Sequence, residues 1–256
     1  MRPADPTPAP PRPPRGYAVV AGSGLGALGE AFAAREVVPF AAIAGVGETA
    51  VAGHRGEVRF CDTGRARCAI VLGRRHHYEA GAEGMRALLA WLAARGTTDL
   101  VAASAAGALD TRLHPGDLVL VHDLIDLQNR ERGGRAAATL RSRVDRALTA
   151  ELAGAARRAR VPLHPGTLAC GAGPAYETPA EVRFLQAAGA DVVTMSAAPE
   201  VTFARQAGLR AAVIAVVTNP GTGIGGAVPG HEEVLRSAAG AAGALTRLIG
   251  ELIDMQ

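Results

Sequence analysis

The sequence of 256 residues contains no lysine, so all 27 of its basic residues are arginine. This absence excludes a P-loop lysine for nucleotide binding and a Schiff-base lysine for covalent carbonyl chemistry. Aromatic residues make up only 4% of the chain, and beyond the N-terminal segment the arginines are scattered among acidic residues. A basic surface interleaved with aromatic side chains is therefore not predicted, and we expect no nucleic-acid partner despite the net charge of +3.

Cysteine and long apolar runs are also scarce. Cys61, Cys68 and Cys170 are odd in number and lack a Cys-x-x-Cys spacing, so neither a disulfide framework nor a metal site is predicted. We expect three reduced thiols in the core. No apolar run reaches the roughly 20 residues of a membrane helix, and the N-terminus lacks the apolar region of a secretory signal. The expected location is the cytoplasm, without a membrane partner.

Apolar residues, in contrast, make up 48% of the chain, and 32 residues are glycine. This length and apolar content fit one large α/β domain or two small ones. Residues 1–15 hold seven prolines and almost nothing that can be buried. They are predicted to form a disordered, polyproline-like tail, so the folded part of the chain is expected to span residues 16–256.

A short apolar strand at residues 17–21 runs into Gly22-Ser23-Gly24-Leu25-Gly26-Ala27, and a helical pattern continues to about Ala34. Glycines let the backbone approach an anion, and a helix N-terminus adds amide donors. The spacing of Gly22, Gly24 and Ala27 also fits the GxGxxA fingerprint of dinucleotide-binding proteins. That fingerprint needs an acid at the end of the next strand, whereas Glu36 precedes that strand and Glu48 lies in a glycine-rich loop. An anion-binding turn and a plain tight turn both remain open.

The apolar run at residues 66–72 is followed by Gly73-Arg74-Arg75-His76-His77-Tyr78-Glu79. We expect a buried strand, and ligands of α/β proteins bind at the ends of such strands. The planar guanidinium of Arg74 offers a fork of donors for phosphate or carboxylate, and His76 would point the same way in an extended backbone. We interpret the pair as an anion clamp, with a solvated, charge-rich loop as the alternative.

Polar or small residues recur where further strands are expected to end. The strand at 100–109 leads into small residues that leave room for a ligand, and those at 191–196 and 210–217 deliver Met195-Ser196 and Thr218-Asn219. Helices are expected at 85–95, at about 140–160 and from His231 to about Asp254.

A polar loop at residues 171–181 precedes a further predicted helix. Thr178, Pro179 and Glu181 have the spacing of an N-cap, a first-turn proline and a capping box. Tyr176 and Glu177 come just before this helix start, where a ring and a carboxylate can stack on and hydrogen-bond a heterocycle. An ordinary loop before a helix is the alternative.

These segments together resemble the trimeric purine nucleoside phosphorylase family, which also includes methylthioadenosine phosphorylases. The resemblance implies a single α/β domain with a mixed central sheet flanked by helices. It extends from about Tyr17 to Ile253 and rests on nine segments in order: Gly22-Ser23-Gly24-Leu25-Gly26, Gly53-His54, Gly73-Arg74-x-His76-x-Tyr78-Glu79, Ala105-Ala106-Gly107, Gly116-Asp117, Tyr176-Glu177-Thr178-x-Ala180-Glu181, Met195-Ser196-x-x-Pro199-Glu200, Thr218-Asn219 and His231-Glu232-Glu233.

The resemblance implies phosphorolysis, in which phosphate displaces a purine from C1 of ribose with inversion, and it implies no cofactor beyond phosphate as co-substrate. The implied phosphate site is Ser23, Arg74, His76, the amide of Ala105 and Ser196. The implied nucleoside site is Tyr78 and Met195 at the ribose, His54 and His231 near its 5′ end, and Tyr176, Glu177 and Asn219 at the base. His76, Glu79 and Asn219 are the implied catalytic residues, with Asn219 stabilising negative charge on the departing purine.

Some positions depart from the family pattern. Ser104 replaces the usual asparagine, Ala108 replaces a glycine, and Ala80 precedes Gly81 where the family has a glycine directly after the Tyr-Glu pair. The segment 126–140 is short and lacks the Asn-Pro-Leu run and the phenylalanine that reaches a neighbouring subunit's site. The resemblance still implies a homotrimer, with a partly open site.

Three interpretations follow from the resemblance. Asn219 favours a phosphorylase for 6-oxopurine nucleosides. The alternatives are a phosphorylase for methylthio-substituted or 6-aminopurine nucleosides, and a catalytically weak nucleoside-binding relative. A dinucleotide-dependent oxidoreductase would explain only the first glycine loop.

Overall fold

The structure is a computed structural model that describes residues 15–49, 54–62, 66–74, 83–128, 144–227 and 230–254. Its strands are β1 (Gly16–Ala21), β2 (Ala34–Pro39), β3 (Glu57–Asp62), β4 (Arg67–Leu72), β5 (Asp99–Ala108), β6 (Leu118–Asp126), β7 (His164–Cys170), β8 (Val192–Thr194) and β9 (Arg210–Pro220). Its helices are α2 (Glu83–Ala94), α4 (Arg146–Ala159), α5 (Pro179–Ala187), α6 (Ala198–Gln206) and α7 (His231–Ile253), with short 3₁₀ turns at η1 (Gly26–Gly29), η2 (Phe40–Ala42) and η4 (Ile224–Gly226).

The described strands form one mixed sheet in the order β2-β3-β4-β1-β5-β8-β7-β6-β9. β1 runs parallel to β4 and to β5. β5 also pairs in parallel with β9, so that β5, β8, β7, β6 and β9 close into a ring. The prediction of a mixed sheet flanked by helices in one α/β domain is confirmed, whereas the closure of half the sheet into a barrel is a new finding.

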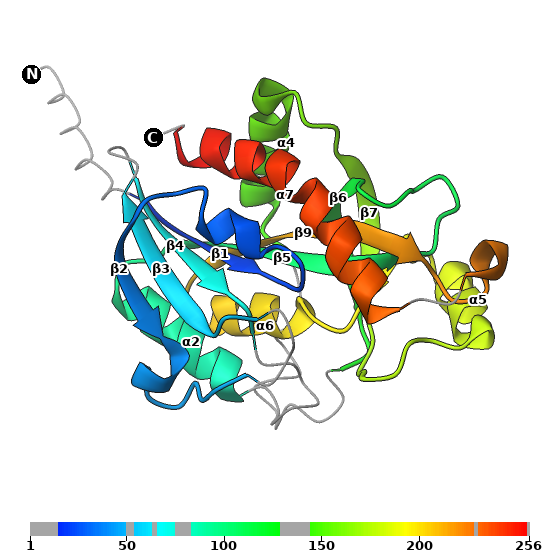
Figure 1. Ribbon diagram of the computed structural model, residues 1–256, viewed down its shortest axis with the longest axis horizontal. Helices are drawn as coiled ribbons and strands as arrows, with labels where there is room; N and C mark the ends of the chain where they lie inside the picture. The colour runs from blue at the N-terminus through cyan, green and yellow to red at the C-terminus, as the bar shows by residue number, and fades with distance from the viewer. Residues whose placement is uncertain are drawn as a thin grey trace, which may run out of the picture.

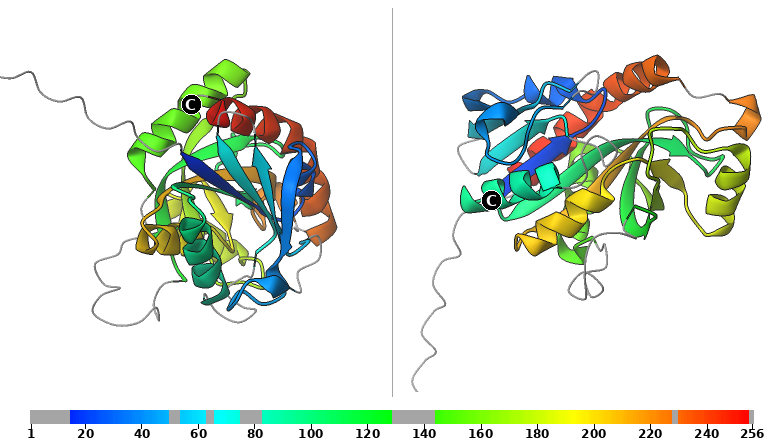
Figure 2. Two further views of the ribbon diagram at one scale, coloured as in Figure 1. Left: turned by 90° about the vertical axis from the view of Figure 1, so that its left-hand side faces the viewer. Right: turned by 90° about the horizontal axis from the view of Figure 1, so that it is seen from below.

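Helices cover both faces of the sheet (Figure 1; Figure 2). α4 and α7 pack on one face, and α2 and α6 lie on the other. Alternate residues of a strand point to opposite faces, and both faces of β1 are buried. Val19 therefore lies in the core cluster of α4 and α7, while Val20 lies in the cluster of α2 and α6. This double burial explains why β1 is apolar throughout.

The prediction of a helix after the first glycine loop is wrong. The chain makes only the four-residue turn η1 before it enters β2. Leu28 is fully buried, and a Cβ on Gly29 would collide with Leu72 of β4, so this turn lies pressed against the sheet. Glycines at positions 26 and 29 also disfavour a regular helix. The loop is therefore not followed by a regular helix whose N-terminus could bind an anion, and an anion contact from Ser23 itself stays a prediction.

Other local predictions are confirmed. Thr178 caps α5, because its hydroxyl accepts from the Glu181 amide at 3.3 Å and the Glu181 carboxylate accepts from the Thr178 amide at 2.7 Å. Of the helix predicted at about 140–160, residues 140–143 lie outside the described residues. The described helix α4 begins at Arg146, and the Asp145 carboxylate caps it by accepting from the amide of Leu148 at 2.8 Å. The three cysteines are buried thiols that form no disulfide with one another, and burial raises the pKa of the Cys68 thiol far above its ordinary value.

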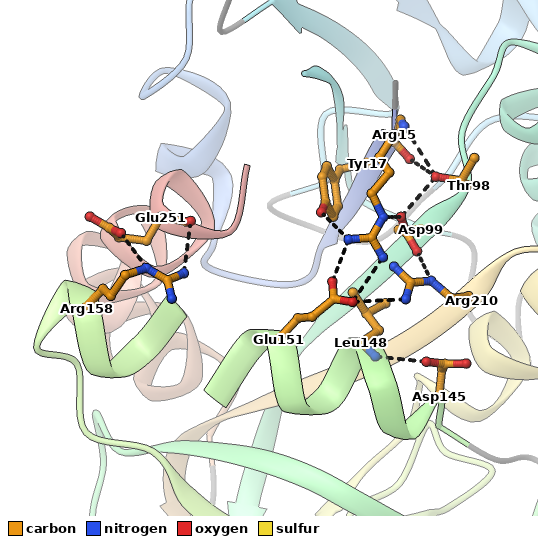
Figure 3. Close-up of polar contacts among 11 residues, drawn as sticks. Arg15, Tyr17, Thr98, Asp99, Asp145, Leu148, Glu151, Arg158, Arg210 and Glu251 are labelled. Carbon is orange, nitrogen blue, oxygen red and sulfur yellow. Dashed lines mark hydrogen bonds and ion pairs between the residues drawn. The ribbon is translucent and has the colours of Figure 1, made fainter. Parts of the chain in front are cut away.

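A buried ionic cluster joins the amino ends of β5 and β9 to α4 (Figure 3). The Asp99 side chain is fully buried, with Nε of Arg210 at 2.5 Å and Nε of Arg15 at 3.3 Å. Both guanidiniums also reach Glu151 of α4, Arg15 at 2.8 Å and Arg210 at 3.1 Å. Arg15, the last residue of the predicted tail, is thus held by the folded domain. Burial raises the pKa of Asp99 above its ordinary value despite these partners.

Arg210→Met is expected to lower the free energy of unfolding by about 2 to 3 kcal/mol at pH 7, because it leaves the buried Asp99 carboxylate with fewer counter-ions. When folding raises the pKa of a carboxyl, the contribution of that group to the free energy of unfolding is lost as the pH rises through the raised pKa. The deficit should therefore shrink as the pH falls and Asp99 takes up a proton. Urea unfolding at pH 5 and pH 7 measures both effects.

Two further variants serve as controls for Arg210→Met. Arg112→Ala removes an ion pair with Asp110 in which the Arg112 side chain is 86% exposed, and it should leave the unfolding midpoint unchanged. Adding Asp99→Asn to Arg210→Met should recover part of the lost stability. A deficit that is independent of pH and is not recovered by Asp99→Asn would contradict the electrostatic account.

Candidate active site

The ends of β1, β4, β5, β8 and β9 surround a cavity of about 310 Å³. The carboxyl ends of parallel strands meet at one edge of a sheet, where α/β proteins bind their ligands. Eight of the residues assigned by resemblance line this cavity: Ser23, Arg74, Ala105, Tyr176, Glu177, Met195, Ser196 and Asn219.

The floor of the cavity lies where strand pairing along β5 is interrupted. β1 pairs with β5 only as far as Ala103, and β8 begins to pair with it at Gly107. The residues between them line the cavity, and on this edge the Ala105 carbonyl accepts from the Thr194 hydroxyl at 2.8 Å. Because the N–H and C=O of a strand residue point to the same edge, the Ala105 amide also points to this side. This geometry fits an amide donor at the predicted position.

Arg74 is 1% exposed, and its guanidinium is held mainly by the protein itself. Nη1 donates to Glu200 at 2.6 Å and to Ser104 at 3.1 Å. Nη2 donates to the carbonyls of Ala103 at 2.5 Å and Val20 at 3.4 Å. A guanidinium has five N–H donors, and the fifth, Nε–H, is buried without a partner among the described residues. Arg74 therefore presents a positive charge and one unpaired donor, not the open fork inferred from the sequence.

Gly22 makes this arrangement possible. A Cβ at that position would lie 2.8 Å from Nη2 of Arg74 and 3.0 Å from the Ala103 carbonyl. The first glycine of the loop therefore serves the close approach of the guanidinium. Gly24 has φ +78° and lies against Leu235 and Ala238 of α7, so its role is a left-handed turn under that helix. Both glycines are therefore explained by packing within the protein, without a bound dinucleotide.

A row of hydroxyl groups links Arg74 to Ser196. The Ser104 hydroxyl accepts from Arg74 and lies 2.5 Å from the Ser196 hydroxyl, to which it can donate its own proton. Thr194 donates its proton to the Ala105 carbonyl, so toward Ser196, at 3.3 Å, it acts as an acceptor. When Ser104 donates to Ser196, the proton of Ser196 is available either to Thr194 or to an anion in the cavity.

His54 connects the loops that carry Ser23 and Arg74. Its Nε2 lies 3.2 Å from the Ser23 hydroxyl, and its Nδ1 lies 3.0 Å from the Arg74 carbonyl. Gly73, with φ +105°, leaves room for this ring, since a Cβ there would lie 2.6 Å from the His54 Cβ. His54 thus bridges Ser23 and Arg74 rather than lining the cavity formed by the described residues.

Tyr176, Glu177 and Asn219 also line the cavity. Tyr176 is 40% exposed, as a ring at a cavity mouth would be. Burial, and to a lesser degree the neighbouring Glu181, raise the pKa of Glu177 above its ordinary value. A Cβ on Gly171 would lie 3.0 Å from Oε1 of Glu177, so glycine at that position leaves space for the carboxylate.

The amide of Asn219 is 4% exposed and oriented by its neighbours. Its Oδ1 accepts from the Thr218 hydroxyl at 2.8 Å, and its Nδ2 donates to the Pro220 carbonyl at 2.8 Å. An amide nitrogen has two protons, so one donor of Asn219 remains for a ligand.

Several assigned residues cannot be placed. His76, Tyr78 and Glu79 lie outside the described residues, and of His231 only the backbone at the start of α7 is described. Val234, one turn further along α7, lines the cavity. The structure also brings three polar residues to which the sequence analysis gave no role against assigned ones: Thr194 beside Ser196, Glu200 beside Arg74 and Thr218 beside Asn219. Thr194 and Thr218 lie near the ends of β8 and β9, where a polar residue after an apolar stretch is a signal. Glu200 lies in the first turn of α6, and its only signal was its place in the segment Met195-Ser196-x-x-Pro199-Glu200.

Two negative findings apply to the described part of the chain. No group of three or more His, Cys, Asp or Glu side chains there is arranged to hold a metal ion. None of the described helices combines the length and the apolar character needed to span a bilayer.

Comparison with known proteins agrees with this geometry. Residues 17–254 match the phosphorylase superfamily, and the chain belongs to that family. Among curated relatives, the purine nucleoside phosphorylase of Mycobacterium bovis is 36% identical, with 92% of this chain and 88% of the relative covered. Purine nucleoside phosphorylase 1 of Bacillus subtilis is 30% identical, with 85% and 83% covered. A crystal structure of Schistosoma mansoni purine nucleoside phosphorylase in complex with adenosine has a TM-score of 0.82 at 28% identity, with 94% and 91% covered.

Proposed function

We propose that this protein is a purine nucleoside phosphorylase, which uses phosphate to cleave purine ribonucleosides and deoxyribonucleosides to the free base and the pentose 1-phosphate. The supporting observation is that one cavity has a buried guanidinium with hydroxyl donors on one side and Tyr176, Glu177 and Asn219 on the other. A phosphate and a purine placed in the two halves would have the ribose between them, beside Met195.

Each half of the cavity has a chemical role in this proposal. Ser23, Arg74, Ser196 and the Ala105 amide would hold phosphate with one positive charge and neutral donors. Glu177 and Asn219 would bind the base, and the free Nδ2–H of Asn219 would stabilise the negative charge that develops on the leaving purine. His76 and Glu79 are proposed to act at the phosphate, Tyr78 at the ribose, and His54 and His231 near its 5′ end, as the family resemblance implies.

We further propose that 6-oxopurine nucleosides are preferred, and that the protein acts as a cytoplasmic homotrimer. The base preference is supported by pairing: an ionised Glu177 accepts from the N1–H of a 6-oxopurine, whereas adenine has a bare acceptor at N1. The trimer is supported by the resemblance alone, and light scattering of the purified protein tests it.

The function is tested by incubating the protein with inosine, guanosine, adenosine or methylthioadenosine, with and without phosphate. Release of free base only in the presence of phosphate, and fastest from inosine or guanosine, is the expected result. Cleavage that is fastest with adenosine or methylthioadenosine would replace the proposed preference with the 6-aminopurine alternative. No cleavage of any of the four, together with measurable nucleoside binding, would favour a nucleoside-binding relative.

The raised pKa of Glu177 predicts a pH-dependent base preference. As the pH falls through this pKa, which lies above the ordinary 4.5, the carboxyl becomes protonated. It is then a weaker, uncharged acceptor for N1–H and gains a donor for the bare N1 of adenine. The ratio of kcat/KM for inosine over adenosine should therefore fall toward acidic pH. The ratio cancels the titration of phosphate, which is common to both reactions.

Glu177→Gln is the control for this pH prediction. Its amide does not titrate, so the ratio in this variant should stay constant over the same pH range. A parent protein whose ratio is as flat as that of the variant would show that Glu177 does not face N1.

A further inference from the structure

Glu200 is a buried carboxylate for which the proposed reaction assigns no role. It lies in the first turn of α6 and is 1% exposed. Its Oε1 lies 2.6 Å from Nη1 of Arg74, and both side chains are almost completely removed from solvent. A buried carboxylate is costly unless it is paired, and the start of a helix adds further stabilisation of the negative charge.

The pair has an electrostatic consequence for the cavity. The unit charge of Arg74 is balanced by that of Glu200, so together they contribute no net positive charge. A phosphate that enters the cavity must share the guanidinium with a carboxylate that is already bound to it. Arg74 is thus oriented for the anion, and its attraction for the anion is reduced at the same time.

We propose that Glu200 is a positioning residue that fixes the Arg74 guanidinium and limits the affinity of the site for phosphate and for the sugar phosphate product. This inference rests on the proposed function. An unopposed buried cation would bind phosphate and pentose 1-phosphate alike, and such uniform binding does not accelerate the chemical step. The carboxylate keeps both anions exchangeable.

Glu200→Gln separates the two roles, because glutamine keeps an oxygen acceptor for Arg74 but removes the negative charge. We expect KM for phosphate to fall about tenfold, with KM for inosine unchanged, and inhibition by ribose 1-phosphate to become stronger by a similar factor. Glu200→Ala removes the acceptor as well, so the guanidinium is no longer held toward α6 and KM for phosphate should rise. A merely structural salt bridge predicts reduced stability in both variants and no fall of KM for phosphate in either.

Thermal unfolding provides a second readout. Phosphate stabilises the protein in proportion to its affinity for the folded state, so the phosphate-induced rise in Tm should be larger in Glu200→Gln than in the parent. Ser104→Ala is the matched control: it removes the other Nη1 acceptor, at 3.1 Å, without changing a charge. It should not lower KM for phosphate. If it lowered KM as much as Glu200→Gln does, charge would not be the cause.

Glu200→Asp covers the case in which Glu200→Gln does not fold. It keeps the charge but is one methylene shorter, so KM for phosphate should rise through loss of orientation; an unchanged KM would overturn the inference. Failure of the proposed function looks different, because then the parent protein itself cleaves no nucleoside. Calorimetric titration of the parent and of Glu200→Gln with inorganic phosphate still tests the inference in that case, and equal affinities would refute it.

Discussion

Arg74→Ala is expected to reduce kcat/KM for phosphate by a factor of about 30 to 1,000, which corresponds to roughly 2 to 4 kcal/mol of transition-state stabilisation. The chain has no lysine that could share this role, and Arg74 is the one buried cation among the described cavity-lining residues. KM for inosine should change much less, because the guanidinium lies in the opposite half of the cavity from Glu177 and Asn219. Initial rates with phosphate varied at saturating inosine measure the effect.

A control separates lost phosphate binding from lost stability. Arg74→Ala leaves the Glu200 carboxylate buried without its counter-ion, which destabilises the fold. The double variant Arg74→Ala/Glu200→Gln should recover the unfolding midpoint but not the use of phosphate. If the single variant keeps the parental phosphate requirement and KM, Arg74 is not part of a phosphate site.

Asn219→Asp is expected to shift base preference from inosine toward adenosine, with a change of several kcal/mol in relative transition-state stabilisation. Asn219 has one free Nδ2–H for O6 or N7 of a 6-oxopurine, while Thr218 holds its Oδ1. An ionised aspartate has no donor, so it repels O6 and accepts from the amino group of adenine. The ratio of kcat/KM values for inosine and adenosine is the measurement, since a general loss of stability affects both substrates alike.

Asn219→Ala is the matched control, because alanine offers neither a donor nor an acceptor. It should slow both substrates without reversing their order. If Asn219→Asp leaves the ratio unchanged, or if the parent already prefers adenosine, Asn219 is removed from the base site and the 6-aminopurine alternative moves to first place.

The positions of the strands and the edge at which the site lies could be predicted from the sequence, because both depend on local patterns. The apolar run before Arg74 and the polar pair Thr218-Asn219 after another run mark strand ends wherever the strands are placed. The capping of α5 by Thr178 follows equally from spacing alone. Such signals involve residues a few positions apart in the sequence, and for these the local backbone geometry determines which residues are in contact.

The partner of Arg74 could not be predicted in this way. Glu200 lies 126 positions further along the chain, and only the packing of α6 against the sheet brings the two together. Nothing near Arg74 in sequence indicates that its Nη donors are already used. The wrong prediction of a helix after Gly26 has a related cause. The leucines there have a spacing that resembles that of a helix, but they pack onto β4 and under α7 and do not form one face of a helix.

The interruption of pairing along β5 bears on one departure of the chain from the family pattern, Ser104. At this point the sheet divides, with β1 ending on one side of the gap and β8 beginning on the other. The peptide groups facing the gap belong to the main chain, so they are present whatever the side chains are, provided that these stay small. Ser104, where the family pattern has asparagine, lies in this gap and meets that condition, whereas Ala108 lies beyond it, where β5 already pairs with β8. The branching of the sheet itself supplies these peptide groups, so we expect them to stay available to a ligand as long as the side chains at this floor stay small.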